Sequence, residues 1–308
     1  MRFAGTLTAV ALAAVYVLWD PASADLAAQL FRAELYRGHG FAIYNPYWYG
    51  GHHLPGYSLL APPLMAIAGP QAAGAVSAVL GTLAFERIAH RFRPGSGTAA
   101  LASIWFAVAF TATCLVTGRI TFAIGAALAL CAAAFAGGAR GRALAPVAAV
   151  LTGLASPVAA ALLGLAMAVW ATTSRPARPI ATAVAVSALV PAATLLLAFP
   201  NGGSFPFVPS SFLPTAAACV VLWLALPRGE TLLRRAVLAI GALVVVSGLV
   251  TSPMGGNATR PATLLAGSIA ILGLWPSAHR RRLFWLAPIL VYWQLYPAFD
   301  DWRQARDD

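Results

Sequence analysis

The sequence has no lysine, and charged residues make up only 9% of its 308 residues. A typical soluble domain is about 25% charged and 45–50% apolar, whereas 60% of this chain is hydrophobic. The scarcity of charge therefore excludes an ordinary soluble protein and a disordered chain. Cysteine is also rare, and Cys114, Cys131 and Cys219 all lie inside apolar runs. This placement argues against a disulfide framework or a zinc site.

Several sequence motifs are missing as well. There is no GxxxxGK[ST] or HExxH motif and no repeat of fixed period, which argues against a nucleotide-driven pump and a zinc protease. The apolar runs contain almost no ionisable residue, whereas ion-coupled transporters need buried acids or histidines near the bilayer midplane. The net charge of +11 comes from arginines in loops, so we expect no nucleic-acid partner.

Apolar runs long enough to cross a membrane are abundant, since about 20 residues are needed for each crossing. Residues 143–173 are too long for one helix and contain Ser156-Pro157, so they form either one kinked helix or two short ones. Residues 57–69, interrupted by Pro62-Pro63, predict a broken or re-entrant entry into the second span. The spans are expected at 3–19, 71–88, 98–117, 120–137, within 143–173, and at 180–199, 212–226, 236–251, 262–275 and 283–298.

The distribution of arginine favours two helices within 143–173, because cytoplasmic loops carry an excess of positive charge. Eleven spans with the N-terminus inside leave six arginines and seven of the nine acids outside, and only Glu86 and Glu230 inside. A single helix would turn every later basic loop outward. With two helices in 143–173, the inside arginines are Arg2, Arg87, Arg91, Arg93, Arg140, Arg142, Arg175, Arg178, Arg228, Arg234, Arg235, Arg280, Arg281 and Arg282.

The chain is thus predicted to be an all-α polytopic transmembrane protein with its C-terminus outside. Residues 1–298 form the transmembrane domain, and residues 299–308 form an acidic outer tail. Polar and aromatic residues concentrate on the outer side, above all in the long first loop, 20–56. We therefore expect the function on that side.

The first outer loop begins with a helical pattern over residues 22–37, typical of an amphipathic helix lying along the membrane surface. Gly38 and Gly40 would end this helix. One predicted face carries Leu26, Leu30, Phe31 and Leu35, and the other carries Asp25, Gln29, Arg32 and Glu34.

Two carboxylates of this loop are candidate catalytic residues, because an acid beside a membrane can act as a base or bind a cation. Asp20 directly follows the first span, and Asp25 lies in the predicted helix. A structural role for Asp20 stays open, since Asp20-Pro21 also fits the N-cap and first turn of a helix.

Aromatic and histidine side chains follow the helix and are candidate substrate-binding residues, because aromatic rings stack on sugars. Trp and Tyr also form belts at the bilayer interface, and both interpretations stay open. For the adjacent histidines, a hydrogen-bonding role is favoured over metal binding. The candidates are His39, Trp48, Tyr49, His52 and His53.

Two outer arginines are candidates for binding a lipid phosphate, because guanidinium groups donate several fixed hydrogen bonds to phosphate oxygens. Arg260 ends the glycine-rich segment 251–260, which also contains Asn257, and Arg119 lies in a tight Gly118-Arg119 turn. The alternative is that each arginine anchors the protein to lipid headgroups.

The first loop as a whole carries a family resemblance. An acid just after the first span, an amphipathic helix and the run from Trp48 to Pro63, WYGG…PGYS…PP, resemble the GT-C-type membrane glycosyltransferases. The loop is similar in particular to an uncharacterised bacterial branch with a W-[YF]-G-G-x-x-x-P-x-Y pattern. The resemblance implies a GT-C-like fold in the bacterial inner membrane. Because many GT-C-type proteins continue into a soluble outer domain, it also implies a shortened or truncated chain.

The resemblance further implies transfer of a sugar from a polyprenyl-phosphate-linked donor to a cell-envelope acceptor on the outer face. An acid of the first loop, here Asp20 or Asp25, would serve as base or bind a divalent cation. The two acids are five residues apart, whereas the superfamily often has an adjacent pair or D-x-D. Two other classes stay open, a transporter or flippase of a lipid or lipid-linked sugar, and a membrane scaffold.

Overall fold

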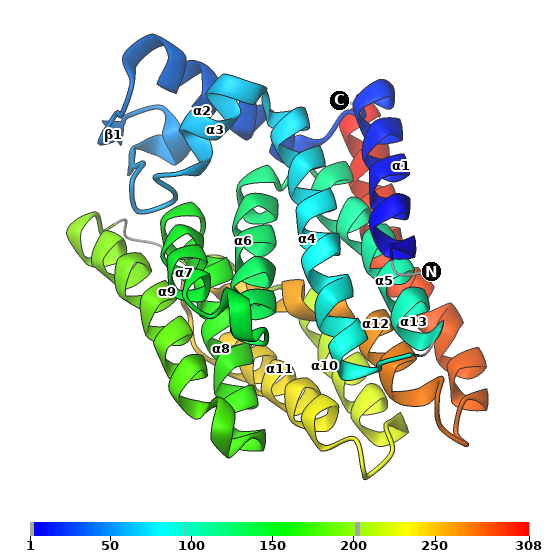
Figure 1. Cartoon of the computed structure of the whole chain (residues 1–308). Coiled ribbons are helices and arrows are strands. Elements are labelled where there is room, and N and C mark those ends of the chain that lie inside the picture. The colour runs from blue at the N-terminus through cyan, green and yellow to red at the C-terminus, as the bar shows by residue number, and fades with distance from the viewer. Residues whose placement is uncertain (1–2, 96, 201–203, 308) are drawn as a thin grey trace.

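The computed structural model describes residues 3–95, 97–200 and 204–307, apart from the side chains of Ala24 and Tyr49. The predictions for Arg2, the Tyr49 side chain and Asp308 therefore lie outside the described residues. Over the described ranges the chain forms thirteen α-helices and one two-stranded hairpin (Figure 1). The prediction of an all-α protein is confirmed. The helices are α1 (Ala4–Trp19), α2 (Ala24–His39), α3 (Ala61–Ala68), α4 (Pro70–Phe92), α5 (Gly97–Phe110), α6 (Ile120–Ala136), α7 (Leu144–Ala155), α8 (Pro157–Thr173), α9 (Arg178–Ala198), α10 (Pro209–Ala225), α11 (Thr231–Leu249), α12 (Arg260–Leu274) and α13 (Arg281–Asp307).

Several of these helices match the length of a membrane crossing. Within the described ranges, four helical segments are long and apolar enough to span a bilayer: 70–92, 97–116, 175–198 and 231–249. Five further apolar helices are shorter. These segments indicate a multi-pass membrane protein.

The segment 143–173 forms two helices, α7 and α8, which meet at Ser156-Pro157. Pro157 cannot donate the backbone hydrogen bond that a continuous helix needs. Ser156 instead caps α8, where its Oγ accepts a hydrogen bond from the Ala159 backbone N–H at 3.3 Å. The two-helix prediction is confirmed, and the single kinked helix is wrong.

Arginines at or near the ends of several helices gather at one end of the bundle and bind other helix ends there. Arg234 donates to the Leu226 carbonyl, Arg235 to that of Thr172 and Arg282 to that of Ala225. Arg93 pairs with Glu230 at 2.6 Å. The last carbonyls of a helix have no partner within the helix, so these side chains supply the missing donors.

The first loop covers the opposite end of the bundle, where α2, α3 and the hairpin lie together (Figure 1). The hairpin pairs β1 (Tyr44–Asn45) with β2 (His52–His53) in antiparallel register, around the 3₁₀ turn η1 (Trp48–Gly50). The apolar run is broken at Gly69, between α3 and α4, and not at Pro62 and Pro63. They stand in the first turn of α3, where proline is well tolerated.

The C-terminal residues also differ from the prediction, because residues 299–307 continue α13 instead of forming a separate tail. Trp302 packs on Trp19 with ring centroids 5.5 Å apart, so the ends of α1 and α13 lie side by side (Figure 1). Gln304 donates a hydrogen bond to Asp300 one turn earlier, at 2.9 Å. These contacts extend the helix and bring its acids close to the first loop.

Candidate functional site

The helix α2 packs on the bundle with residues of both predicted faces, since Leu26 is buried as well as Gln29 and Arg32. Gln29 and Arg32 are 3% and 2% exposed, whereas Leu30 and Phe31 are 38% and 37% exposed. Gln29 accepts a hydrogen bond from the Thr121 hydroxyl at 2.7 Å. The start of α6 thus supplies a partner for the amide of Gln29 and for the guanidinium of Arg32.

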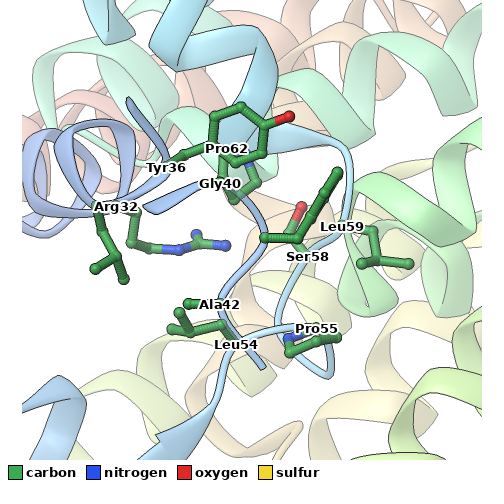
Figure 2. A pocket seen from close by; sticks show the side chains of 11 residues that line it. Arg32, Tyr36, Gly40, Ala42, Leu54, Pro55, Ser58, Leu59 and Pro62 are labelled. Atoms are coloured by element: carbon green, nitrogen blue, oxygen red, sulfur yellow. The ribbon is translucent and has the colours of Figure 1, made fainter. Parts of the chain in front are cut away.

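Arg32 is held by aromatic rings of the first loop. Its guanidinium lies 4.5 Å from the Tyr57 ring centroid and 5.5 Å from that of Trp48, and its Nη1 donates to Thr121 at 2.9 Å. Figure 2 shows Arg32 beside Ser58 in a small cavity of about 20 Å³. A cation between aromatic faces is stabilised by their quadrupoles, so Arg32 fixes the loop onto α2.

The turn at Gly118 joins α2 to the bundle. A π-helical segment, η2 (Thr111–Val116), precedes it, and the Arg119 N–H donates to the Cys114 carbonyl at 2.8 Å. Gly118 has φ +69°, and a Cβ there would lie 2.5 Å from the Leu26 amide nitrogen. Only glycine therefore fits at this position, and the close approach places Arg119 against the first turn of α2.

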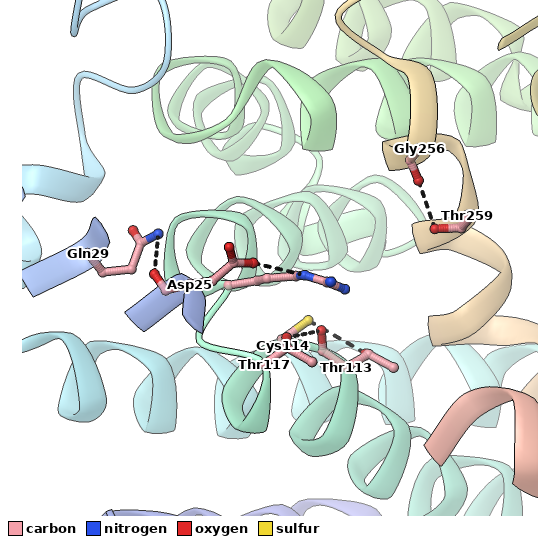
Figure 3. A network of polar contacts seen from close by, with 8 residues as sticks. Asp25, Gln29, Thr113, Cys114, Thr117, Gly256 and Thr259 are labelled. Carbon is pink, nitrogen blue, oxygen red and sulfur yellow. Dashed lines mark hydrogen bonds and ion pairs between the residues drawn. The ribbon is translucent and has the colours of Figure 1, made fainter. Parts of the chain in front are cut away.

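Arg119 forms an ion pair with Asp25, with 3.2 Å between Nε and the carboxylate oxygen Oδ2. Both side chains are partly exposed, at 36% and 49%. Figure 3 labels Asp25 and marks its ion pair with a dashed line. Asp25 also lies in the first turn of α2, where the helix dipole stabilises a carboxylate. Two residues that the sequence placed in separate loops thus meet.

Arg260 adds a second positively charged side chain to the Asp25–Arg119 cluster. It begins α12, outside the predicted span 262–275, and its guanidinium lies 4.5 Å from the Phe122 ring centroid. Burial, followed by the charge of Arg119, lowers its pKa to about 10, while Tyr57 and Asp25 oppose this shift. Arg260 therefore remains charged at neutral pH beside a like charge.

A large apolar cavity lies below Arg260. Its volume is about 530 Å³, and its wall includes Phe122, the ring under the guanidinium. Along α12 the wall extends from Pro261 to Leu272, which is about 17 Å at 1.5 Å per residue. Cavities of 300–1,000 Å³ are typical of small-molecule sites. We call Asp25, Arg119 and Arg260, with this cavity, the outer site.

Asp301 is a member of the outer site that the sequence interpretation missed, because it was assigned to a polar tail. Burial raises the pKa of Asp301, and the charges of Asp25 and Asp300 add to this effect, whereas Arg119 opposes it. No pattern in the sequence links residue 301 to residue 119. Only the continuation of α13 brings them together.

The other candidate residues lie outside this cluster. Asp20 is exposed, has φ +45° and ends α1 instead of capping α2, so the N-cap prediction is wrong. Its carboxylate accepts a hydrogen bond from Gln71 at 2.9 Å. His39 is exposed at the end of α2, and Asn257 bonds to the Pro253 carbonyl at 3.3 Å.

The histidine and tryptophan candidates belong to the hairpin. The His52 Nδ1 lies 3.2 Å from the Trp48 carbonyl oxygen, and His53 packs on Tyr44. Because neighbouring residues of a strand point to opposite faces, the two histidines do not converge on one ion. Trp48 is 6% exposed and stacks on Phe31, so its ring is committed to packing.

A divalent cation needs several oxygen ligands, six or more for calcium. Among residues 3–95, 97–200 and 204–307, no three His, Cys, Asp or Glu side chains gather closely enough to hold a metal ion. Asp25 is moreover bound to Arg119. These side chains do not fit a bound divalent cation, and no cation takes part in the proposed reaction.

Comparison with known proteins assigns no family to this chain. No protein-family model, no curated protein and no solved structure matches this chain.

Proposed function

We propose that this protein transfers a sugar from a polyprenyl-phosphate-linked donor to an envelope acceptor, at the outer face of a bacterial inner membrane. The observation that carries the proposal is the position of Arg260, which lies over Phe122 in the wall of the apolar cavity and interacts electrostatically with Arg119. Two guanidinium groups suit a phosphate, and an apolar wall about 17 Å long suits a polyprenyl chain.

The proposal includes the predicted membrane topology of eleven spans, which lie along α1 and α4–α13 and leave Arg260 and Asp301 outside the spans 262–275 and 283–298. It is supported by the arginine-rich loops, which gather at one end of the bundle and bind helix carbonyls there. The outer site lies at the opposite end, with the first loop. This arrangement would place the sugar transfer outside the cytoplasm.

In the proposed reaction the acceptor hydroxyl attacks the anomeric carbon, and the bond from that carbon to the phosphate oxygen breaks. Negative charge accumulates on the departing phosphate. Arg119 and Arg260 would stabilise this charge, because fixed cations aimed at a leaving group lower the barrier. Asp25 would hold Arg119 in position through their ion pair.

The test uses the purified protein in detergent with polyprenyl-phosphate hexoses and pentoses, and an envelope fraction as acceptor. We expect labelled sugar to enter the envelope fraction, and the Arg260→Gln variant to lose about 10²–10³-fold in kcat. Arg303→Gln is the matched control, because Arg303 is an exposed arginine at the same end of the bundle. It should retain full activity.

A transporter or flippase would give a different result. It would bind the lipid in detergent and form no product, because no membrane is left to cross. Absence of transfer from every donor in the panel, with retained lipid binding, would therefore overturn the transferase proposal. Loss of a copurifying protein when Trp48 is changed would instead favour a scaffold.

A further inference from the structure

Asp301 is a half-buried acid, and one oxygen of its carboxylate is in an unusual environment. Its Oδ2 is fully buried and has no hydrogen-bond partner among the described residues. The neighbouring Asp300, by contrast, accepts a hydrogen bond from Gln304 at 2.9 Å. Buried polar atoms in native proteins are nearly always satisfied, so this oxygen needs an explanation.

The groups around Asp301 come from several elements of the outer site. Arg119 and Asp25 act on it from the α5–α6 turn and from α2, and Asp300 acts on it from its own helix. Arg260, on α12, interacts in turn with Arg119 and Asp25. The thiol of Cys114, on η2, interacts with the same two arginines. Asp301 thus belongs electrostatically to the proposed phosphate site.

We propose that Asp301 is the proton acceptor of the outer site. This inference rests on the proposed function and assigns the base of that reaction. The acceptor O–H bond breaks and its proton moves to Asp301 Oδ2, while the new bond forms between the acceptor oxygen and the anomeric carbon. The electron pair of the broken glycosyl bond leaves with the polyprenyl phosphate, whose charge Arg119 and Arg260 balance.

Neither acid of the first loop serves this role as well. The carboxylate of Asp25 is already bound to Arg119. Asp20 is exposed and bonded to Gln71. Asp301 has a buried oxygen available for a proton, and burial raises its pKa. A base works best when its pKa is near the operating pH.

The first experiment measures sugar transfer by Asp301→Asn and Asp300→Asn under the conditions described above. We expect D301N to lower kcat about 10²–10⁴-fold with KM changed less than threefold, and D300N to stay within twofold of the wild type. Asp301→Glu should restore part of the activity, because it restores the base. Thermal unfolding of each variant controls for folding.

The pH profile supplies a readout that a structural role would not affect. The base must be ionised to accept a proton, so wild-type kcat should fall as pH is lowered through the raised pKa of Asp301. The D301N variant should lack this limb of the profile. Normal transfer by D301N, or an unchanged pH limb, would overturn the inference and leave the proposed function intact. Absence of transfer in the wild type would overturn both.

A binding measurement tests the same assignment without an acceptor. When farnesyl phosphate binds at the arginines, its negative charge should favour protonation of Asp301. Wild-type affinity should therefore rise more steeply than that of D301N as pH falls, by up to about tenfold per pH unit. The phosphate of the ligand titrates in the same way in both measurements, so its contribution cancels when the two proteins are compared. Parallel curves for the two proteins would contradict proton uptake at Asp301.

Discussion

Substitution of Gly118 by alanine tests whether close packing of the Gly118-Arg119 turn assembles the outer site. An added Cβ would lie 2.5 Å from both the Leu26 amide nitrogen and the Ser23 hydroxyl. The turn and the first turn of α2 would have to separate. Because Asp25 lies in that turn of α2, we expect its ion pair with Arg119 to break.

The expected loss of stability in G118A has two contributions. A residue with a side chain in the left-handed region lowers the free energy of unfolding by about 1–2 kcal/mol. Overpacking lowers it by about 1–3 kcal/mol more. Gly40→Ala is the matched control, since Gly40 has nearly the same φ, +67°, and no atom within 4 Å of the added Cβ. G118A should therefore be about 1–3 kcal/mol less stable than G40A.

Thermal unfolding in detergent measures this difference with a thiol-reactive dye, because Cys114 and Cys219 are buried in the folded protein. At about 2 °C per kcal/mol, G118A should unfold several degrees below G40A. It should also bind farnesyl phosphate more weakly, whereas G40A should bind it normally. Equal unfolding temperatures together with equal affinities would refute the packing argument.

Two further predictions concern the opposite end of the bundle and the cavity. Glu86 is 1% exposed and accepts hydrogen bonds from the Gly5 N–H at 2.9 Å and the Thr6 hydroxyl at 2.6 Å. Glu86→Gln should lower stability by about 2–3 kcal/mol through loss of these charge-assisted bonds, and an unchanged unfolding temperature would count against it. Ala129 lines the apolar cavity, so Ala129→Phe should reduce binding of polyprenyl phosphate, measured by native mass spectrometry, without lowering the unfolding temperature. Retained binding would show that the lipid chain lies elsewhere.

The sequence predicted the helices well because their signals are local. Apolar runs, glycine and proline positions and arginine-rich loops mark where each helix begins and ends. The break at Ser156-Pro157 and the turn at Gly118-Arg119 were both located correctly. Each depends on backbone chemistry within a few residues.

Periodicity identified two faces of α2 without showing what each one meets. Gln29 and Arg32 of the polar face and Leu26 of the apolar face are all buried. Their partners, Thr121 and Tyr57, come from segments far along the chain. Such pairing depends on tertiary packing, which no local pattern records.

The scarcity of charge thus determined the class of protein. With so few ionisable residues, most of the chain must be apolar helix, and this conclusion needs only composition and span length. The tertiary structure decided which charges meet. It joined Asp25 to Arg119, placed Arg260 above an apolar cavity and brought Asp301 to the same place. Electrostatic interaction depends on distance in space, and distance along the chain gives no measure of it.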